Sequence, residues 1–228
     1  MEIRNVGLIT YQHPHLKTEQ ILQRLLCKNY AYKIYALPFN PRPDRACIVN
    51  HRPNQMDAIE PAVIAKRHDI TYIKCDSDKD IDNSCDVYLV LGAGILSPEC
   101  LKGKDVINCH PGVIPTSRGL DSFKWAILDL KPLGVTLHYI NEQVDAGEII
   151  SVKPTNVYET DSLNTLSRRH YENEIEMFAD FDIYLNAPQN LYVNIEPSEP
   201  RMRMPKEREV ELESRLVEYK RIYGQEFK

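Results

Sequence analysis

Strand-like and helical patterns alternate along the first 130 residues, and this alternation constrains the fold more than any other feature of the chain. Apolar runs rich in β-branched and aromatic residues are typical of buried strands. We expect strands at 3–10, 32–37, 70–74, 86–91 and 106–109, and helices at 16–26, 57–68 and 122–130. Because strands that alternate with helices pair in parallel, the pattern predicts an α/β fold: a mostly parallel, twisted, Rossmann-like sheet with helices on both faces.

Two strand-like runs after Pro132 change this rhythm. The loop between L-G-V-T-L-H-Y-I and E-I-I-S-V-K-P is too short for a crossover helix, so we expect an antiparallel pair near the C-terminal end of the sheet. Asp121 is expected to cap the helix at 122–130, and Asp161 a long helix that runs toward Leu185.

A proline-containing segment and a highly charged helical pattern follow this long helix. We therefore predict a domain over residues 1–187 and a C-terminal extension over 188–228 that carries a helical tail. The tail is expected to dock on the domain or to bind a partner, and it is our candidate for forming a homodimer. Its apolar stripe would comprise Val210, Leu212, Leu216, Val217 and Tyr219.

Charge and cysteine content exclude several classes of protein. A net charge of -5 over 228 residues argues against a nucleic-acid-binding surface. The six cysteines lie far apart with no C-x-x-C, so we expect neither a disulfide framework nor a zinc site or other metal. No stretch is long and apolar enough for a membrane span or a signal peptide, and we expect a soluble cytoplasmic protein.

Polar residues lie where strands of this sheet should end. Asn108 and His110 close the strand at 106–109, and Asp145 lies in the loop between the two antiparallel runs. Because ligands of open parallel sheets collect at the carboxyl ends of the strands, these three side chains can converge there. An Asn amide and a His can stabilise an oxygen that becomes negative during acyl transfer, and a carboxylate can orient the His. Cys109 is not expected to be a nucleophile, because strand alternation turns its side chain to the opposite face.

Each of these features also has an ordinary structural explanation. A His after a strand is often a surface or core residue, and Asp-Ala-Gly is a common turn. The segment L-V-L-G-A-G-I-L has two glycines of a nucleotide-binding loop but lacks the third, so a dinucleotide site is only weakly indicated.

Taken together, three segments resemble the folate-dependent formyltransferase family. They are N-C-H-P-G-V-I-P-T-S-R-G, L-G-V-T-L-H-Y-I-N-E-Q-V-D-A-G-E-I-I and L-V-L-G-A-G-I-L-S, and the resemblance spans roughly residues 85–155. The family includes glycinamide ribonucleotide, methionyl-tRNA and sugar N-formyltransferases.

The resemblance implies that Asn108, His110 and Asp145 match the catalytic Asn, His and Asp of the family. It also implies that 10-formyltetrahydrofolate binds across the end of the sheet and that His138 is structural. Its pterin would be held largely by backbone groups of a set comprising Ile95, Leu96, Glu142, Gln143, Val144 and Asp145.

Departures from the family pattern favour an amino-sugar acceptor carried on a nucleotide diphosphate. T-Y-Q-H-P-H-L-K stands where a purine-pathway enzyme would have a glycine-serine-asparagine phosphate loop, and Gly112 and the Arg118-Gly119 pair are more similar to the sugar enzymes. A glycinamide ribonucleotide acceptor and a non-catalytic folate- or nucleotide-binding protein stay open as alternatives. Location alone makes Arg118, His13, His15 and the loop 42–52 candidates for binding the acceptor, though each can equally be solvated surface.

Overall fold

The computed structural model describes residues 2–39, 46–187 and 197–226. The chain forms two compact units. The first comprises Met1–Arg42, Asn54–Asn108 and Tyr139–Glu142, and the second comprises Pro43–Pro53, Cys109–His138 and Gln143–Lys228.

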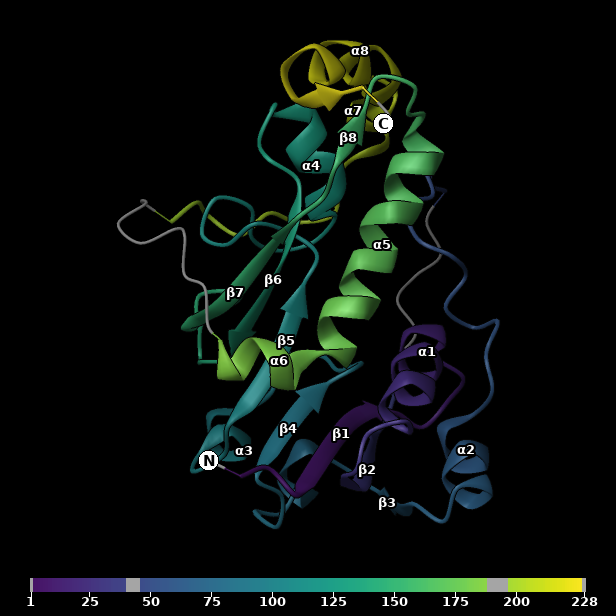
Figure 1. Ribbon diagram of the computed structural model, residues 1–228, viewed down its shortest axis with the longest axis vertical. Helices are drawn as coiled ribbons and strands as arrows, with labels where there is room; N and C mark the ends of the chain where they lie inside the picture. The colour runs from purple at the N-terminus through teal and green to yellow at the C-terminus, as the bar shows by residue number, and fades with distance from the viewer. Residues whose placement is uncertain (1, 40–45, 188–196, 227–228) are drawn as a thin grey trace. The chain divides into compact units, whose positions relative to one another are not determined.

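The first unit is a parallel sheet with its helices. In chain order it contains β1 (Asn5–Tyr11), α1 (Leu16–Leu25), β2 (Ala31–Leu37), α2 (Pro61–Arg67), β3 (Thr71–Lys74), β4 (Val87–Val90), α3 (Pro98–Leu101) and most of β5 (Val106–His110). β1 pairs in parallel with β2 and β4, β2 with β3, and β4 with β5. In Figure 1, β2, β1 and β4 lie side by side in this order. Every residue of β4 is buried, as expected for a strand covered on both faces.

The second unit contains an antiparallel strand pair and the C-terminal helices. Its elements are α4 (Ser122–Leu128), β6 (Gly134–Tyr139), β7 (Ile149–Pro154), β8 (Val157–Tyr158), α5 (Leu163–Ala179), α6 (Phe181–Asn186), α7 (Lys206–Glu209), α8 (Leu212–Tyr223) and β9 (Gly224–Gln225). β6 and β7 pair antiparallel, and β8 pairs with β9 in a small parallel sheet.

The main sheet has the strand order β3-β2-β1-β4-β5-β6-β7. A mostly parallel sheet with one antiparallel pair at its C-terminal end is therefore confirmed. The β8–β9 pair was not expected, because two-residue strands carry no pattern in the sequence.

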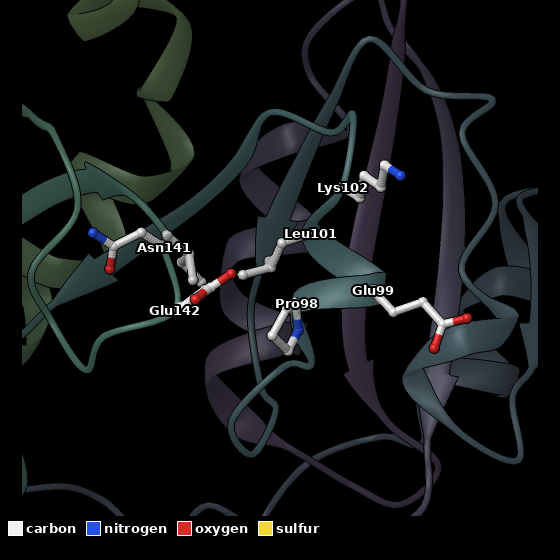
Figure 2. A pocket seen from close by; sticks show the side chains of 7 residues that line it. Pro98, Glu99, Leu101, Lys102, Asn141 and Glu142 are labelled. Atoms are coloured by element: carbon white, nitrogen blue, oxygen red, sulfur yellow. The ribbon is translucent and has the colours of Figure 1, made fainter.

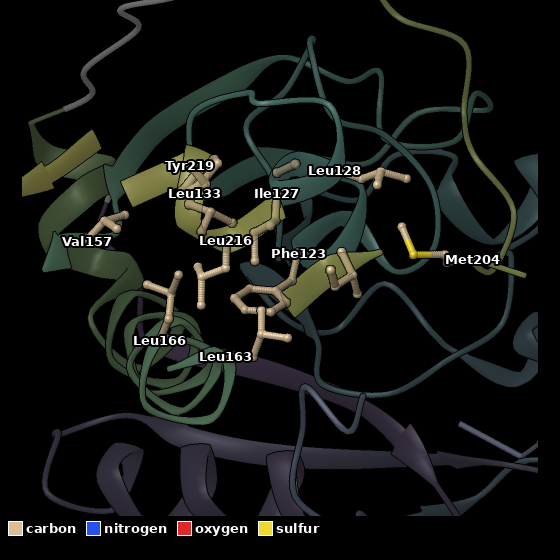
Figure 3. Packing of buried hydrophobic residues seen from close by; sticks show 12 residues of the cluster. Phe123, Ile127, Leu128, Leu133, Val157, Leu163, Leu166, Met204, Leu216 and Tyr219 are labelled. Carbon is tan, nitrogen blue, oxygen red and sulfur yellow. The ribbon is translucent and has the colours of Figure 1, made fainter. Parts of the chain in front are cut away.

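One hydrophobic cluster of the second unit joins α4 and α5 to the C-terminal helix α8. Figure 3 shows Phe123 of α4 close to Leu216 of α8 and Leu163 of α5. Tyr219 is fully buried, and its hydroxyl donates to the Lys131 carbonyl. Below α8, Lys124 of α4 makes a buried ion pair with Glu209 at 2.7 Å. The tail is thus packed as core, which explains why an otherwise highly charged segment is helical.

Two predicted helix caps are wrong. Asp121 has left-handed backbone angles (φ 54°) and makes no cap hydrogen bond, because its carboxylate accepts the backbone N–H of Met204. The long helix is capped by Ser162 in a capping box with Thr165. Asp161 instead binds Arg169 and accepts the N–H of Tyr158.

Several element boundaries also differ from the predictions. The helix expected from Asp57 begins at Pro61, since proline favours the first helical turn. The helix expected to reach Leu185 ends at Ala179, where Asp180 leaves helical angles.

The predicted tail stripe is wrong in part. Leu212, Leu216 and Tyr219 lie at helical spacing on one face of α8 and are buried. Val210, which precedes α8, and Val217, on another face of this helix, are 61% and 51% exposed.

Candidate active site

His110 and Asp145 lie together within the second unit. His110 is the last residue of β5 and is 3% exposed. Asp145 lies in the loop between β6 and β7, with left-handed backbone angles (φ 47°). Its Oδ1 is 3.3 Å from Nδ1 of His110 and 3.9 Å from Nε2 of the buried His138. The carboxylate therefore faces two imidazoles.

The partners of His110 Nε2 fix the tautomer of the ring. This nitrogen is 2.9 Å from the Ser117 carbonyl oxygen and 3.1 Å from Ser122 Oγ. The Ser122 hydroxyl donates its own hydrogen to the Gly119 carbonyl. Both neighbours are therefore acceptors, and Nε2 must carry a hydrogen. It follows that Nδ1, which faces Asp145, is the nitrogen that gains or loses a proton.

Burial and charge act on His110 in opposite directions. Burial lowers its pKa from the ordinary value, because the imidazolium is poorly solvated. The Asp145 carboxylate and the Ser117 carbonyl oppose this effect but do not cancel it. The result is a neutral imidazole whose protonated form is stabilised by one nearby carboxylate, an arrangement suited to transient proton uptake.

The loop after His110 folds back on the histidine. A Cβ atom added to Gly112 would lie 2.7 Å from His110 Nε2 and 2.8 Å from the Ser117 carbonyl oxygen. A larger residue here would push the loop from the imidazole. The packing around His110 therefore explains why position 112 is a glycine without any role in acceptor binding.

Asn108 and Cys109 differ in their surroundings as alternation predicts. Asn108 is half-buried on β5, two residues before His110, and alternation along the strand turns both side chains to one face. Cys109 is 1% exposed on the opposite face. Ser117 and Ser122, which contact His110 directly, were not among the predicted site residues, because a serine in a loop carries no distinguishing signal.

A second buried polar cluster lies on the His110 side of the second unit. His170 is 2.8 Å from Thr155 Oγ1 through Nδ1 and 3.2 Å from the Pro111 carbonyl through Nε2, and burial lowers its pKa to about 4. Arg52, a proposed acceptor residue, forms an ion pair with the buried Glu174. Arg42, at the start of the same proposed loop, lies outside the described residues.

Of the residues predicted to hold folate, Glu142 lines a shallow pocket of about 550 Å³ in the first unit. Figure 2 shows Pro98, Leu101 and Glu142 directed toward one another. Its apolar walls are Pro98, Leu101 and Ile140, and its polar lining residues are Glu99, Lys102, Asn141 and Glu142.

Of the remaining residues predicted to hold folate, Ile95 is 85% exposed, whereas Leu96 is packed in the core of the first unit. Gln143 and Val144 are exposed, and the Val144 carbonyl accepts hydrogen bonds from Arg118.

His13 and His15 belong to an aromatic group after β1. The His13 ring stacks on Tyr11 with centroids 5.3 Å apart, and Phe39 contacts both rings. His15 meets the Tyr11 ring edge-on and bonds Thr18. These contacts account for His15, whereas Nε2 of His13 is buried without a hydrogen-bond partner among the described residues.

In the part of the chain that the structure describes, no three His, Cys, Asp or Glu side chains are grouped so as to hold a metal ion. None of its helices has both the length and the apolar character needed to cross a membrane.

Known proteins match this chain in the segment that holds the site. The formyl transferase family matches residues 84–181. Phosphoribosylglycinamide formyltransferase of Bacillus subtilis (strain 168) is 36% identical over 73 residues, 32% of this chain and 37% of that enzyme. The chain thus spans well under two thirds of the length of this curated relative.

Solved structures share the fold over most of the chain. A sugar N-formyltransferase from Shewanella sp FDAARGOS_354 superposes with a TM-score of 0.61 at 20% identity, covering 86% of this chain and 75% of that one. The formyltransferase PseJ from Anoxybacillus kamchatkensis, solved with UDP-4,6-dideoxy-4-formamido-L-AltNAc and tetrahydrofolate, gives 0.50 at 20% identity and covers 82% of each chain. The segment that matches the formyl transferase family contains both motifs that meet at His110.

Proposed function

We propose that this protein is an N-formyltransferase that moves a formyl group from 10-formyltetrahydrofolate to the amine of an amino sugar carried on a nucleotide. The observation that supports formyl transfer most directly is the buried His110–Asp145 pair, formed by the two motif segments. A histidine whose titrating nitrogen faces a carboxylate can take up a proton during attack by an amine.

Each member of the predicted triad has a distinct role in this proposal. Bound 10-formyltetrahydrofolate would supply the formyl group. The acceptor amine would bond to the formyl carbon, the bond from that carbon to N10 would break, and tetrahydrofolate would leave with the proton that the amine loses. The Asn108 amide donates to the formyl oxygen as negative charge builds on it. His110 takes up a proton at Nδ1 while its Nε2–H stays bonded to Ser117 and Ser122, and Asp145 stabilises the resulting imidazolium.

We propose that the pterin of the folate binds in the pocket of the first unit. A pterin is a flat ring with hydrogen-bonding edges, and apolar walls with a few polar groups are typical of sites for such ligands. Leu101 and Ile140 would contact the ring faces, and Asn141 and Glu142 would bind its edge. Asp145 follows Glu142, which lines this pocket, by three residues. One short loop would therefore contact the formyl donor and also carry the carboxylate that faces His110.

The folds of two sugar-enzyme structures and the composition of the first loop support an amino-sugar acceptor. The sugar N-formyltransferase from Shewanella and the UDP-sugar complex of PseJ share the fold, and the first loop lacks the glycines of a phosphate loop. Glycinamide ribonucleotide is the second candidate, because a curated relative with 36% identity acts in that reaction by name.

Product analysis with purified protein tests both acceptors. We would incubate the protein and 10-formyltetrahydrofolate with a panel of nucleotide-linked 3-amino and 4-amino sugars, with glycinamide ribonucleotide, and with no acceptor. Formylated nucleotide sugar is expected, detected by mass spectrometry and by release of tetrahydrofolate. Turnover of glycinamide ribonucleotide alone would reject the sugar.

Two variants separate an enzyme from a folate-binding protein. Asn108→Ala and His110→Ala should abolish most of the turnover while folate still binds. Folate binding by the parent without turnover of any acceptor would instead favour the non-catalytic alternative.

A further inference from the structure

Arg118 connects the loop after His110 to two other segments of the second unit. Its Nε and Nη2 both donate to the Val144 carbonyl, at 3.0 and 2.6 Å, and its Nη1 donates to the Ser198 carbonyl at 3.0 Å. One planar guanidinium thus joins the residue before Asp145 to the C-terminal extension. A forked donor is suited to such a junction, because its nitrogens are fixed relative to one another.

Backbone bonds fix the same junction on both sides of Arg118. The Gly119 N–H donates to Asp145 Oδ2 at 2.8 Å, which leaves Oδ1 for His110. The Arg201 N–H donates to the Arg118 carbonyl, and the Leu120 N–H donates to the Arg201 carbonyl. Gly119 has φ 87°, and a Cβ atom there would lie 2.2 Å from the Arg201 carbonyl oxygen. Only glycine allows the extension to approach this closely.

The loop that carries Asp145 needs such support. Asp145 itself has left-handed backbone angles, which an aspartate adopts at some cost. The preceding residues Glu142, Gln143 and Val144 are exposed. The contacts from Arg118 and Gly119 therefore add restraint, from the Val144 carbonyl and from Oδ2, on the carboxylate that faces His110.

We propose that Arg118 is a positioning residue: through the Val144 carbonyl, and braced by residues 198–201 of the C-terminal extension, it holds Asp145 at His110. This assignment rests on the proposed function and gives Arg118 a role other than binding the acceptor. Three of the five N–H donors of Arg118 are already engaged by two backbone carbonyls.

Titration of His110 tests the assignment without any substrate. The Asp145 carboxylate raises the pKa of His110, so releasing the carboxylate should lower that pKa further. We expect Arg118→Ala to shift the His110 titration to lower pH, followed by NMR with the ring signals assigned through His110→Gln. Arg168→Ala, which removes a cation that is 79% exposed on α5, should leave the titration unchanged.

Kinetics provide the second readout. Because a small misplacement of a catalytic group can cost about a hundredfold in rate, we expect Arg118→Ala to lower kcat roughly tenfold to a hundredfold, with little change in KM for the acceptor. Arg118→Lys keeps the positive charge but not the forked set of donors. It should therefore fold, and its kcat should still be lowered nearly as much as that of Arg118→Ala. Thermal unfolding of each variant identifies any that fails to fold.

Three results would overturn the assignment. They are an unchanged His110 titration in a folded Arg118→Ala protein, a full rescue by Arg118→Lys, and a rise in acceptor KM as the sole effect. Since the titration needs neither donor nor acceptor, it decides the matter even where no acceptor is formylated, an outcome that counts against the proposed function alone.

Discussion

The two carboxylate oxygens of Asp145 contact different partners. Oδ1 faces the imidazole of His110, and Oδ2 accepts the N–H of Gly119. An asparagine could keep the second contact through its amide oxygen, and it tolerates left-handed backbone angles. What it could not provide is the negative charge that stabilises protonated His110.

Asp145→Asn should therefore fold normally, bind folate nearly as well as the parent, and lose roughly a hundredfold or more in kcat. Steady-state rates with a formyl acceptor and a separate folate titration provide the measurement. Glu148→Gln neutralises an exposed carboxylate in the same loop and should change neither quantity. Rates of the Asp145 variant close to those of the parent would show that this residue only forms the turn.

The residues around His110 differ in how well the sequence predicts them. His110 and Asp145 belong to motifs whose order along the chain is distinctive, and the structure brings them within 3.3 Å, although their roles stay predictions. The contact of Ser122 with His110 and the contacts of Arg118 could not be predicted, because they depend on how loops fold together. The Arg118 contacts join it to residues 26 and 80 positions later in the chain. The sequence predicts a cap at Asp121 because nothing in it indicates that this carboxylate accepts the N–H of Met204.

Among the elements, α8 is the one whose buried face the sequence pattern defines least clearly. Its pattern is dominated by charge, yet Leu216 is 3% exposed and packs in the cluster with Phe123 and Leu163. Its neighbour Val217 is 51% exposed. Helical spacing places Leu216 on the same face as Leu212 and Tyr219, whereas Val217 points about 100° away from Leu216.

Leu216→Ala should lower the free energy of unfolding by about 2–5 kcal/mol, the range for large-to-small changes in a core. Val217→Ala, one position along the same helix, should change it by no more than about 0.5 kcal/mol. Urea unfolding followed by circular dichroism measures both. Equal effects of the two substitutions would show that α8 is not packed on α4 and α5 as described.

For the whole molecule, buried histidines couple stability to pH. Burial lowers the pKa of His51, His110 and His170, for His170 from 6.5 to about 4. Because each pKa is lower in the folded state than in the unfolded chain, protons bind preferentially to the unfolded chain. Their combined contribution is therefore fully present above about pH 6.5 and is lost as pH falls toward 4.

His170→Gln tests the part of this loss that belongs to one residue. The parent should lose stability between pH 6.5 and 4 more steeply than the variant, with a difference of at most about 3 kcal/mol from this group. Chemical unfolding at a series of pH values gives the two slopes. His68→Gln is the control, because His68 is exposed after α2 and should leave the slope unchanged. Parallel curves for the parent and the His170 variant would contradict the lowered pKa.

The strand-and-helix pattern was sufficient to predict the sheet, since parallel pairing follows from local alternation. The dependence of the second unit on its C-terminal residues was not predictable, because Met204, Glu209 and Tyr219 bind segments some 80 residues earlier without any shared pattern.

The bridge between Gly119 and Arg201 has a consequence for the order of biosynthesis. A ribosome adds about 5–20 residues per second. His110 and Asp145 are therefore made several seconds before the segment that braces their loop. A nascent chain that has passed Asp145 holds all three predicted catalytic residues but not the Ser198 carbonyl that Arg118 binds. If the brace is needed for formyl transfer, the chain gains activity only after residues 198–201 have been made.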